Sequence, residues 1–179
     1  ATQNPVEFSG TYPLPEAQMD RFAVKLDVLT PQKDDMRRMI TEQGVVGNPA
    51  EPSRELSADG LSRLQEMVDA IYLPEAIRDH TAAVVAITHP DHEEAPEQVR
   101  DCVKYGASPR AAIWLTRLAR AVALMDGRPT VGFEDVTTVG PAVLGHRLIL
   151  DHAARIEGYT GRGIAAETIK QREEKILQQ

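Results

Sequence analysis

Cysteine, aromatic residues and positive charge are all scarce in this chain. Cys102 is the single cysteine among 179 residues, so an internal disulfide and a cysteine-based zinc site are both excluded. Cys102 is therefore expected to be a small, partly buried apolar residue. Aromatic residues make up 4% of the chain, so its core has to be built from Ala, Leu, Val, Ile and Met. Those residues suit packed helices better than a β-sandwich.

The formal net charge is −7, and the sequence shows neither a membrane-length apolar run nor a signal peptide. Proteins that bind a nucleic-acid duplex usually carry a surplus of basic residues, because neutralising phosphates supplies most of their affinity. We therefore expect a cytoplasmic protein with neither a membrane nor a nucleic-acid partner. A helix-turn-helix over Thr130–Leu150 is the remaining DNA-binding interpretation, and the negative charge argues against it.

Helical periodicity dominates from Ser57 onward. One predicted helix runs from Ser57 to Pro74, where a second begins that ends at His89-Pro90. The strongest predicted helix starts at Ser108-Pro109 and ends at Gly127. Its apolar face is predicted to consist of Leu115, Leu118, Val122 and Met125.

The last third of the chain is less regular. Residues 133–150 predict one or two short helices, because Pro141 and Gly145 interrupt them. The glycine-rich string 158–163 lacks the Gly-Lys-Ser/Thr ending of a phosphate-binding loop, so we interpret it as a flexible connection before a charged helix over 164–177. The string His89–Glu94 contains ligand types that suit zinc, but a solvated loop is the favoured interpretation.

The first thirty residues differ from the rest. A short helix is predicted to end near Arg21, and the apolar residues then alternate with others in steps of two. That alternation predicts a strand over 22–28. The predicted strand has an unpaired edge, so swapping or aggregation is expected. A polar helix over 31–43 and a linker over 44–54 follow. The coarse prediction is a piece of an α/β layer followed by a helical bundle.

Three short strings contain residues that could act on a nucleotide. Asn4, in Ala1-Thr2-Gln3-Asn4-Pro5, could orient water at the end of a strand, or could simply form a turn. Arg21, in Glu16-Ala17-Gln18-Met19-Asp20-Arg21-Phe22 at the end of the short helix, could stabilise transition-state charge, or could only pair with the helix C-terminus. Arg110 belongs to Gly106-Ala107-Ser108-Pro109-Arg110-Ala111. With Ser108 as the N-cap and Pro109 as the first helical residue, it lies in the first turn of its helix, where a cation is unfavourable unless an anion is near. A phosphate would resolve that conflict, and so would a carboxylate such as Asp101.

The order and spacing of the three strings resemble the second half of a MoxR-type AAA+ ATPase. The resemblance covers roughly residues 1–150. It also includes Gly10–Pro15, the segment from Met125 to Val136, and His146-Arg147-Leu148.

The resemblance implies a fold and roles for individual residues. The fold is mainly α, with a helical AAA+ lid bundle preceded by a remnant (short helix and strand) of the α/β core. Asn4 matches sensor 1, Arg21 matches the arginine finger, and Arg110 matches sensor 2. The string Gly106, Ser108, Pro109, Arg110 is expected to face the nucleotide. No protein metal ligand is assigned in this chain.

The resemblance also implies domains. Residues 1–30 are expected to complete the nucleotide-binding core and 31–54 to form a helix and linker. Residues 55–152 are expected to form the lid, and 153–179 a flexible glycine-rich connection with a C-terminal helix.

The implied activity is ATP hydrolysis by a chaperone-like homo-oligomeric ring, expected to be a hexamer and to have a von Willebrand factor A-domain protein as a partner. The phosphate loop and the acidic motif for Mg²⁺ are expected upstream of Ala1, so we expect this chain alone to be inactive. The alternative is a non-catalytic helical protein-interaction module in which Asn4, Arg21 and Arg110 are incidental.

Overall fold

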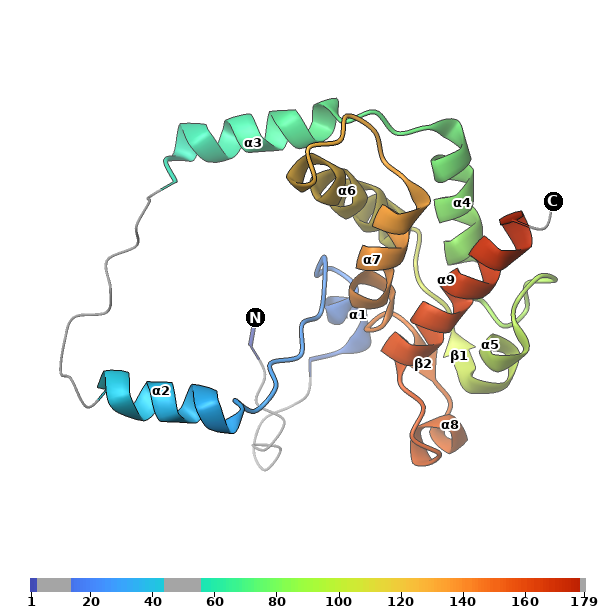
Figure 1. Ribbon diagram of the computed structural model, residues 1–179. Helices are drawn as coiled ribbons and strands as arrows, with labels where there is room; N and C mark the ends of the chain where they lie inside the picture. Colours follow the sequence, from blue (N-terminus) through green and yellow to red (C-terminus); the bar gives the residue numbers. More distant parts are fainter. Residues whose placement is uncertain (3–13, 44–55, 178–179) are drawn as a thin grey trace. The chain divides into compact units, whose positions relative to one another are not determined.

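The computed structural model describes residues 1–2, 14–43 and 56–177 (Figure 1). It is mainly helical, as the sequence predicted. The elements are α1 (Glu16–Met19), α2 (Lys33–Gln43), α3 (Ala58–Ala70), α4 (Glu75–Ala86), α5 (Glu97–Cys102), β1 (Val103–Tyr105), α6 (Arg110–Met125), α7 (Phe133–Leu144), β2 (Ile149–Leu150), α8 (His152–Ile156) and α9 (Gly161–Leu177). The predicted linker over 44–54 lies outside the described residues.

The chain divides into two compact units. The larger contains Ala1–Lys25 and Met67–Gln179, and the smaller contains Leu26–Glu66. In the smaller unit, α2 exposes apolar side chains at helical spacing, namely Met36, Met39 and Ile40. None of the helices in the described part of the chain is long and apolar enough to cross a membrane.

The core of the larger unit lies where α7 packs against both α6 and α9 (Figure 1). The buried face of α6 is formed by Ala111, Leu115, Ala119 and Ala123. Three of these four residues are alanines, so a neighbouring helix can approach α6 closely. The predicted apolar face was therefore only partly right, because Met125 is 85% exposed.

Residues near the C-terminus belong to this core. In α9, Ile164, Ala165 and Ile169 are almost fully buried. Gly161 and Gly163 lie inside α9, so the interpretation of 158–163 as a flexible connection was wrong in its second half. Gly158, with a φ of 88°, ends α8 in the left-handed region that glycine adopts without strain.

A short antiparallel pair of strands was missed by the sequence analysis. In it, β1 pairs with β2 so that Val103 faces Leu150, and α5 leads directly into β1. Cys102, at the end of α5, is 6% exposed and acts as the small apolar core residue that was expected. After α7 the chain forms β2 and not a second helix, so Thr130–Leu150 is not a helix-turn-helix.

The predicted strand over 22–28 was wrong. These residues form a turn and then irregular backbone without a strand partner. Only Val24 packs against the core, whereas Leu26 and Val28 are 72% and 96% exposed. Lys25 donates its backbone N–H to the Ala142 carbonyl over 3.1 Å, which ties this segment to α7. Swapping was expected through the unpaired edge of this strand, but the residues form no strand that could present such an edge.

Candidate functional site

The loop that leads into α6 is fixed by the end of α4. Ala107 donates its N–H to Thr88 Oγ1 over 3.0 Å, and His89 Nε2 lies 3.0 Å from the Ala107 carbonyl. Gly106 lies so close to this region that an added Cβ would be 2.7 Å from the Thr88 carbonyl oxygen. The start of α6 therefore has a backbone path that only glycine at position 106 permits.

Replacing Gly106 with alanine is expected to destabilise the fold by about 2 kcal/mol, because backbone atoms of Thr88 and His89 have to move. Urea unfolding followed by circular dichroism measures the change. Gly163→Ala is the matched control, since its Cβ would meet only the Thr160 hydroxyl at 3.2 Å within a helix. Equal stability of the two variants would contradict the argument.

The helix α6 begins at Arg110, one residue after the first helical residue predicted at Pro109, and Ser108 does not cap it. Pro109 is the N-cap residue and no side chain caps the helix. The Ser108 hydroxyl instead donates to Asp20 Oδ1 over 2.7 Å. Arg110 is 52% exposed and its Nη1 lies 2.5 Å from Asp20 Oδ2. The carboxylate beside Arg110 is thus Asp20 and not Asp101.

The carboxylate of Asp20 accepts hydrogen bonds from residues that are far apart in the sequence. Besides Ser108 and Arg110, Arg147 donates from Nε to Asp20 Oδ1 over 3.1 Å. Burial alone would raise the pKa of Asp20, but hydrogen bonds from Ser108 and Arg110 and the charge of Arg147 outweigh it. The pKa of Asp20 therefore lies below 3.8, and Asp20 is an anion at neutral pH.

Arg147 is a further residue of the site, and no role for it was predicted from the sequence. Its side chain is 1% exposed. It donates to the backbone carbonyls of Asp20, Phe22 and Ala23, and to that of Val143 in α7. The sequence did contain a signal for this role. An arginine within the mostly apolar segment from Val143 to Leu150 is either buried with hydrogen-bond partners or exposed where the segment is interrupted.

Arg21 lies in the turn after α1 and its side chain is exposed. Among the described residues, its guanidinium has no hydrogen-bond or ion-pair partner. It directly follows Asp20, the C-cap residue of α1, so both interpretations of Arg21 stay predictions. The structure brings Ser108 and Arg110 to Asp20, directly next to Arg21 in the chain. Asn4 lies outside the described residues.

The string His89–Glu94 shows no metal-binding geometry. No group of three or more His, Cys, Asp or Glu residues in the described ranges could hold a metal ion. His89 binds the Ala107 carbonyl, and His92 Nδ1 accepts the N–H of Glu94 over 3.1 Å. The solvated-loop interpretation therefore fits the structure better.

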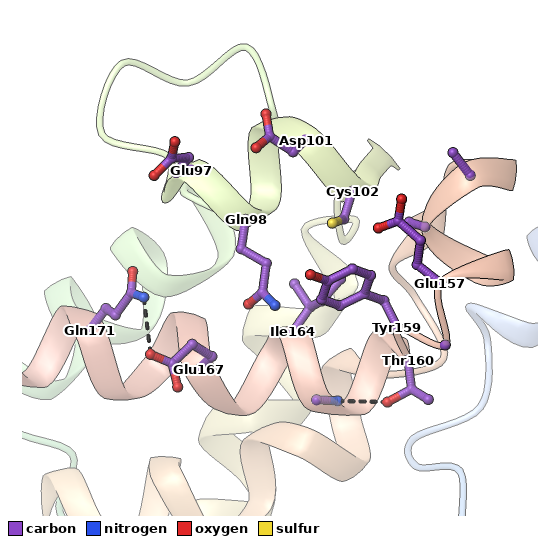
Figure 2. A pocket seen from close by; sticks show the side chains of 14 residues that line it. Glu97, Gln98, Asp101, Cys102, Glu157, Tyr159, Thr160, Ile164, Glu167 and Gln171 are labelled. Atoms are coloured by element: carbon purple, nitrogen blue, oxygen red, sulfur yellow. Dashed lines mark hydrogen bonds between the residues drawn. The ribbon is translucent and has the colours of Figure 1, made fainter.

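A separate pocket of about 1020 Å³ lies between α5, α8 and α9. Its lining includes Glu97, Gln98 and Asp101 of α5, and Figure 2 shows the Gln98 side chain extending toward α9. Glu157 and Glu167 add further carboxylates to the lining, and none of the candidate residues above lines this pocket. Because carboxylates repel phosphate groups, this pocket does not suit a nucleotide.

Two family profiles match the chain. The profile described as "AAA lid domain" matches residues 96–169, and the one described as "ATPase family associated with various cellular activities (AAA)" matches residues 1–24. The chain is also similar to "Chaperone MoxR1" of Mycobacterium tuberculosis, with 41% identity over 86% of this chain and 40% of that protein. "Protein MoxR" of Methylorubrum extorquens is 29% identical over 84% of this chain and 47% of its own length.

A solved structure agrees with these sequence matches. The crystal structure of "a putative ATPase" from Cytophaga hutchinsonii superposes with a TM-score of 0.86 and 33% identity, over 95% of this chain and 51% of that one. The chain thus spans about half the length of the proteins that it matches. Both the three-string pattern and the helical fold point to the same family, and the chain belongs to the MoxR-type AAA+ ATPases.

Proposed function

We propose that this chain supplies the sensor 2 arginine, the arginine finger and the lid to an ATP-hydrolysing MoxR-type protein. The observation that carries the proposal is the start of α6. There Arg110 lies at the positive end of a helix of 16 residues, half exposed, against the single carboxylate of Asp20. A helix N-terminus with an arginine attracts anions.

Asp20 shows what chemistry this position accepts. Its carboxylate takes bonds from the Ser108 hydroxyl and the Arg110 guanidinium, which are the kinds of donor that bind phosphate oxygens. Arg110 is about half exposed, and Asp20, whose side chain is 19% exposed, keeps Ser108 and Arg147 as donors when Arg110 leaves. Arg110 can therefore exchange Asp20 for the γ-phosphate of ATP at little cost.

The remaining roles follow from the family resemblance. Arg21 acts on the nucleotide of an adjacent subunit in a homo-oligomeric ring, and Asn4 orients the attacking water. Gly106, Ser108 and Pro109 form the nucleotide-facing loop together with Arg110. Mg²⁺ and its acidic ligands belong to a part of the full-length protein that this chain does not contain. Here "full-length" means a protein of its relatives' length that includes this chain.

Four wider features are also proposals. The ring is expected to be a hexamer in the cytoplasm, to act as a chaperone, and to work with a von Willebrand factor A-domain partner. "Chaperone MoxR1", to which the chain is similar, has that activity in its name.

The test is ATP turnover by the full-length protein with Arg110→Ala. We expect kcat to fall roughly 30-fold, because one charge-assisted contact to the γ-phosphate, of about 2 kcal/mol, is lost. Arg117→Ala is the matched control, since Arg117 lies two turns later on α6 and its guanidinium lies near Trp114. A loss of the same size in both variants would argue against a sensor role for Arg110.

The alternative, a non-catalytic helical interaction module, is favoured by one observation. Helix α2 exposes Met36, Met39 and Ile40 at i, i+3 and i+4, a spacing that suits contact with another protein. Full ATP turnover by the Arg110→Ala and Arg21→Ala variants would leave this module as the better description.

A further inference from the structure

The turn that carries Arg21 is attached to the lid through its backbone. Arg147 donates from Nη2 to the carbonyl of Asp20 over 2.9 Å and to that of Phe22 over 2.5 Å. These carbonyl groups belong to the residues immediately before and after Arg21. Because both point to the buried guanidinium of Arg147, the side chain of Arg21 is left exposed at the surface of the turn.

Arg147 has little freedom of its own. Its Nη1 donates to the carbonyls of Ala23 and Val143, and its Nε donates to Asp20 Oδ1. All three nitrogens of a planar, rigid group are therefore engaged. Val143 belongs to α7, so the position of the turn is set by α7 and its C-terminal end.

Two neighbouring contacts also hold this turn against α7. His146 Nε2 lies 3.2 Å from the Phe22 carbonyl, and the backbone N–H of Lys25 bonds to Ala142. The whole segment from Asp20 to Lys25 is thus held along the end of α7. In contrast, the pair between Arg155 and Glu16 is exposed and 3.8 Å long, so it contributes little.

Asp20 connects this attachment to Arg110. Its Oδ1 accepts from Ser108 and Arg147, and its Oδ2 accepts from Arg110. If Arg110 leaves for another anion, the bonds of Oδ1 and of the Asp20 carbonyl remain. The turn therefore stays on the lid while Arg110 changes partner.

We propose that Arg147 and Asp20 are positioning residues that fix the Arg21 turn to the helical lid, so that the finger moves as one body with Arg110. A lid movement driven by nucleotide in one subunit would then be passed directly to the neighbouring active site. This inference rests on the proposed function for its use of ATP, but the attachment itself does not.

The attachment is tested by amide hydrogen exchange of the full-length protein without nucleotide. Arg147→Met is expected to speed exchange at residues 21–25 by tenfold or more, because the carbonyls on both sides of Arg21 lose their donor. The matched control is Arg155→Met, which also removes an arginine between the lid and the α1 segment. We expect less than a twofold change there. Unchanged exchange at 21–25 in Arg147→Met would overturn the proposal.

Coupling to the neighbouring site is tested by turnover. Arg147→Met is expected to lower kcat about tenfold with KM for ATP within twofold, since its own nucleotide contacts are intact. Mixing it with Arg110→Ala subunits, whose finger is intact, should raise turnover above the mean of the two variants. A raised KM with unchanged kcat, or turnover no higher than the mean, would contradict the coupling.

A second variant covers the case in which Arg147→Met does not fold. Arg147→Lys keeps the charge beside Asp20, but one nitrogen cannot bond the carbonyls on both sides of Arg21. It should show the same fast exchange at 21–25 and the same rescue on mixing. The outcomes also separate the two proposals. If Arg21→Ala leaves turnover intact, the finger role fails, while the exchange result still decides whether Arg147 holds the turn.

Discussion

Replacing Arg21 with alanine is expected to lower ATP turnover of the full-length protein by about 10³-fold. An arginine finger stabilises charge that develops on the transferred phosphoryl group, and losing one costs 10³-fold or more in kcat. Arg21 suits this role because its side chain is exposed and has no partner among the described residues, while its backbone is held on both sides. A steady-state assay of phosphate release measures the effect.

The matched control for Arg21 is Lys25→Ala. Lys25 is an exposed cation on the same segment, and its anchoring contact uses the backbone N–H, which alanine keeps. We expect its turnover to stay within twofold of the unmodified protein. Mixed rings give the second check, because subunits with Arg21→Ala should regain turnover beside subunits that still carry the finger. Turnover within tenfold of normal for Arg21→Ala alone would remove the finger assignment.

The stability of the fold is expected to fall as the pH drops from 7.5 to 5, because of His80. This side chain is 2% exposed, packs edge-on against Phe133 at 5.0 Å, and has no partner in the described part of the chain for either ring nitrogen. Burial, together with the charge of Arg172, lowers the pKa of His80 from 6.5 to about 4. The folded state therefore favours the neutral ring.

The sign follows from proton linkage. A histidine whose pKa is lower in the folded state contributes its full stability above pH 6.5, and that stability is lost as the pH falls toward 4. The free energy of unfolding should decrease by about 2 kcal/mol between pH 7.5 and pH 5, and by about 3 kcal/mol at pH 4. Asp20 and Asp135 have pKa values below 3.8, so their contributions are lost only at lower pH.

Urea unfolding at several pH values measures this dependence. His80→Leu should be within about 1 kcal/mol of the unmodified protein at pH 7.5 and should lose most of the slope. Some dependence of the free energy of unfolding on pH will remain, because burial also lowers the pKa of His146. The control His152→Gln changes an exposed histidine and should leave the curve unchanged. An equal slope in His80→Leu and the unmodified protein would exclude His80 as the cause.

Local signals in the sequence predicted the start and end of the main helix correctly. Ser108-Pro109 placed Arg110 in the first turn of α6, and Gly127 ended the helix with a φ of 71°. The apolar face was less predictable. Large residues such as Met125 suggested one stripe, whereas α6 buries mostly alanines because α7 approaches it closely. Residue size thus mattered more than hydrophobicity on this face.

The strand predicted over 22–28 failed for a reason that no local pattern contains. The carbonyls of its first two residues, Phe22 and Ala23, accept hydrogen bonds from Arg147, which lies more than a hundred positions later in the chain. The contact between Asp20 and Arg147 in the candidate site was not predictable for the same reason. Both residues belong to strings that the resemblance includes, but no local pattern indicates that two strings so far apart in the sequence are in contact. Short elements such as β1 and β2 were missed because two or three residues show no periodicity.

The way that Arg147 holds its partner has a consequence for how this protein can vary. Arg147 recognises main-chain oxygen atoms at positions 20, 22 and 23, and every amino acid provides those atoms. The side chains at 22 and 23 are therefore free to be exchanged during evolution or engineering. An insertion or deletion of one residue is different, because it shifts the oxygen atoms out of reach. The length of this turn, more than its composition, is what natural variation should preserve.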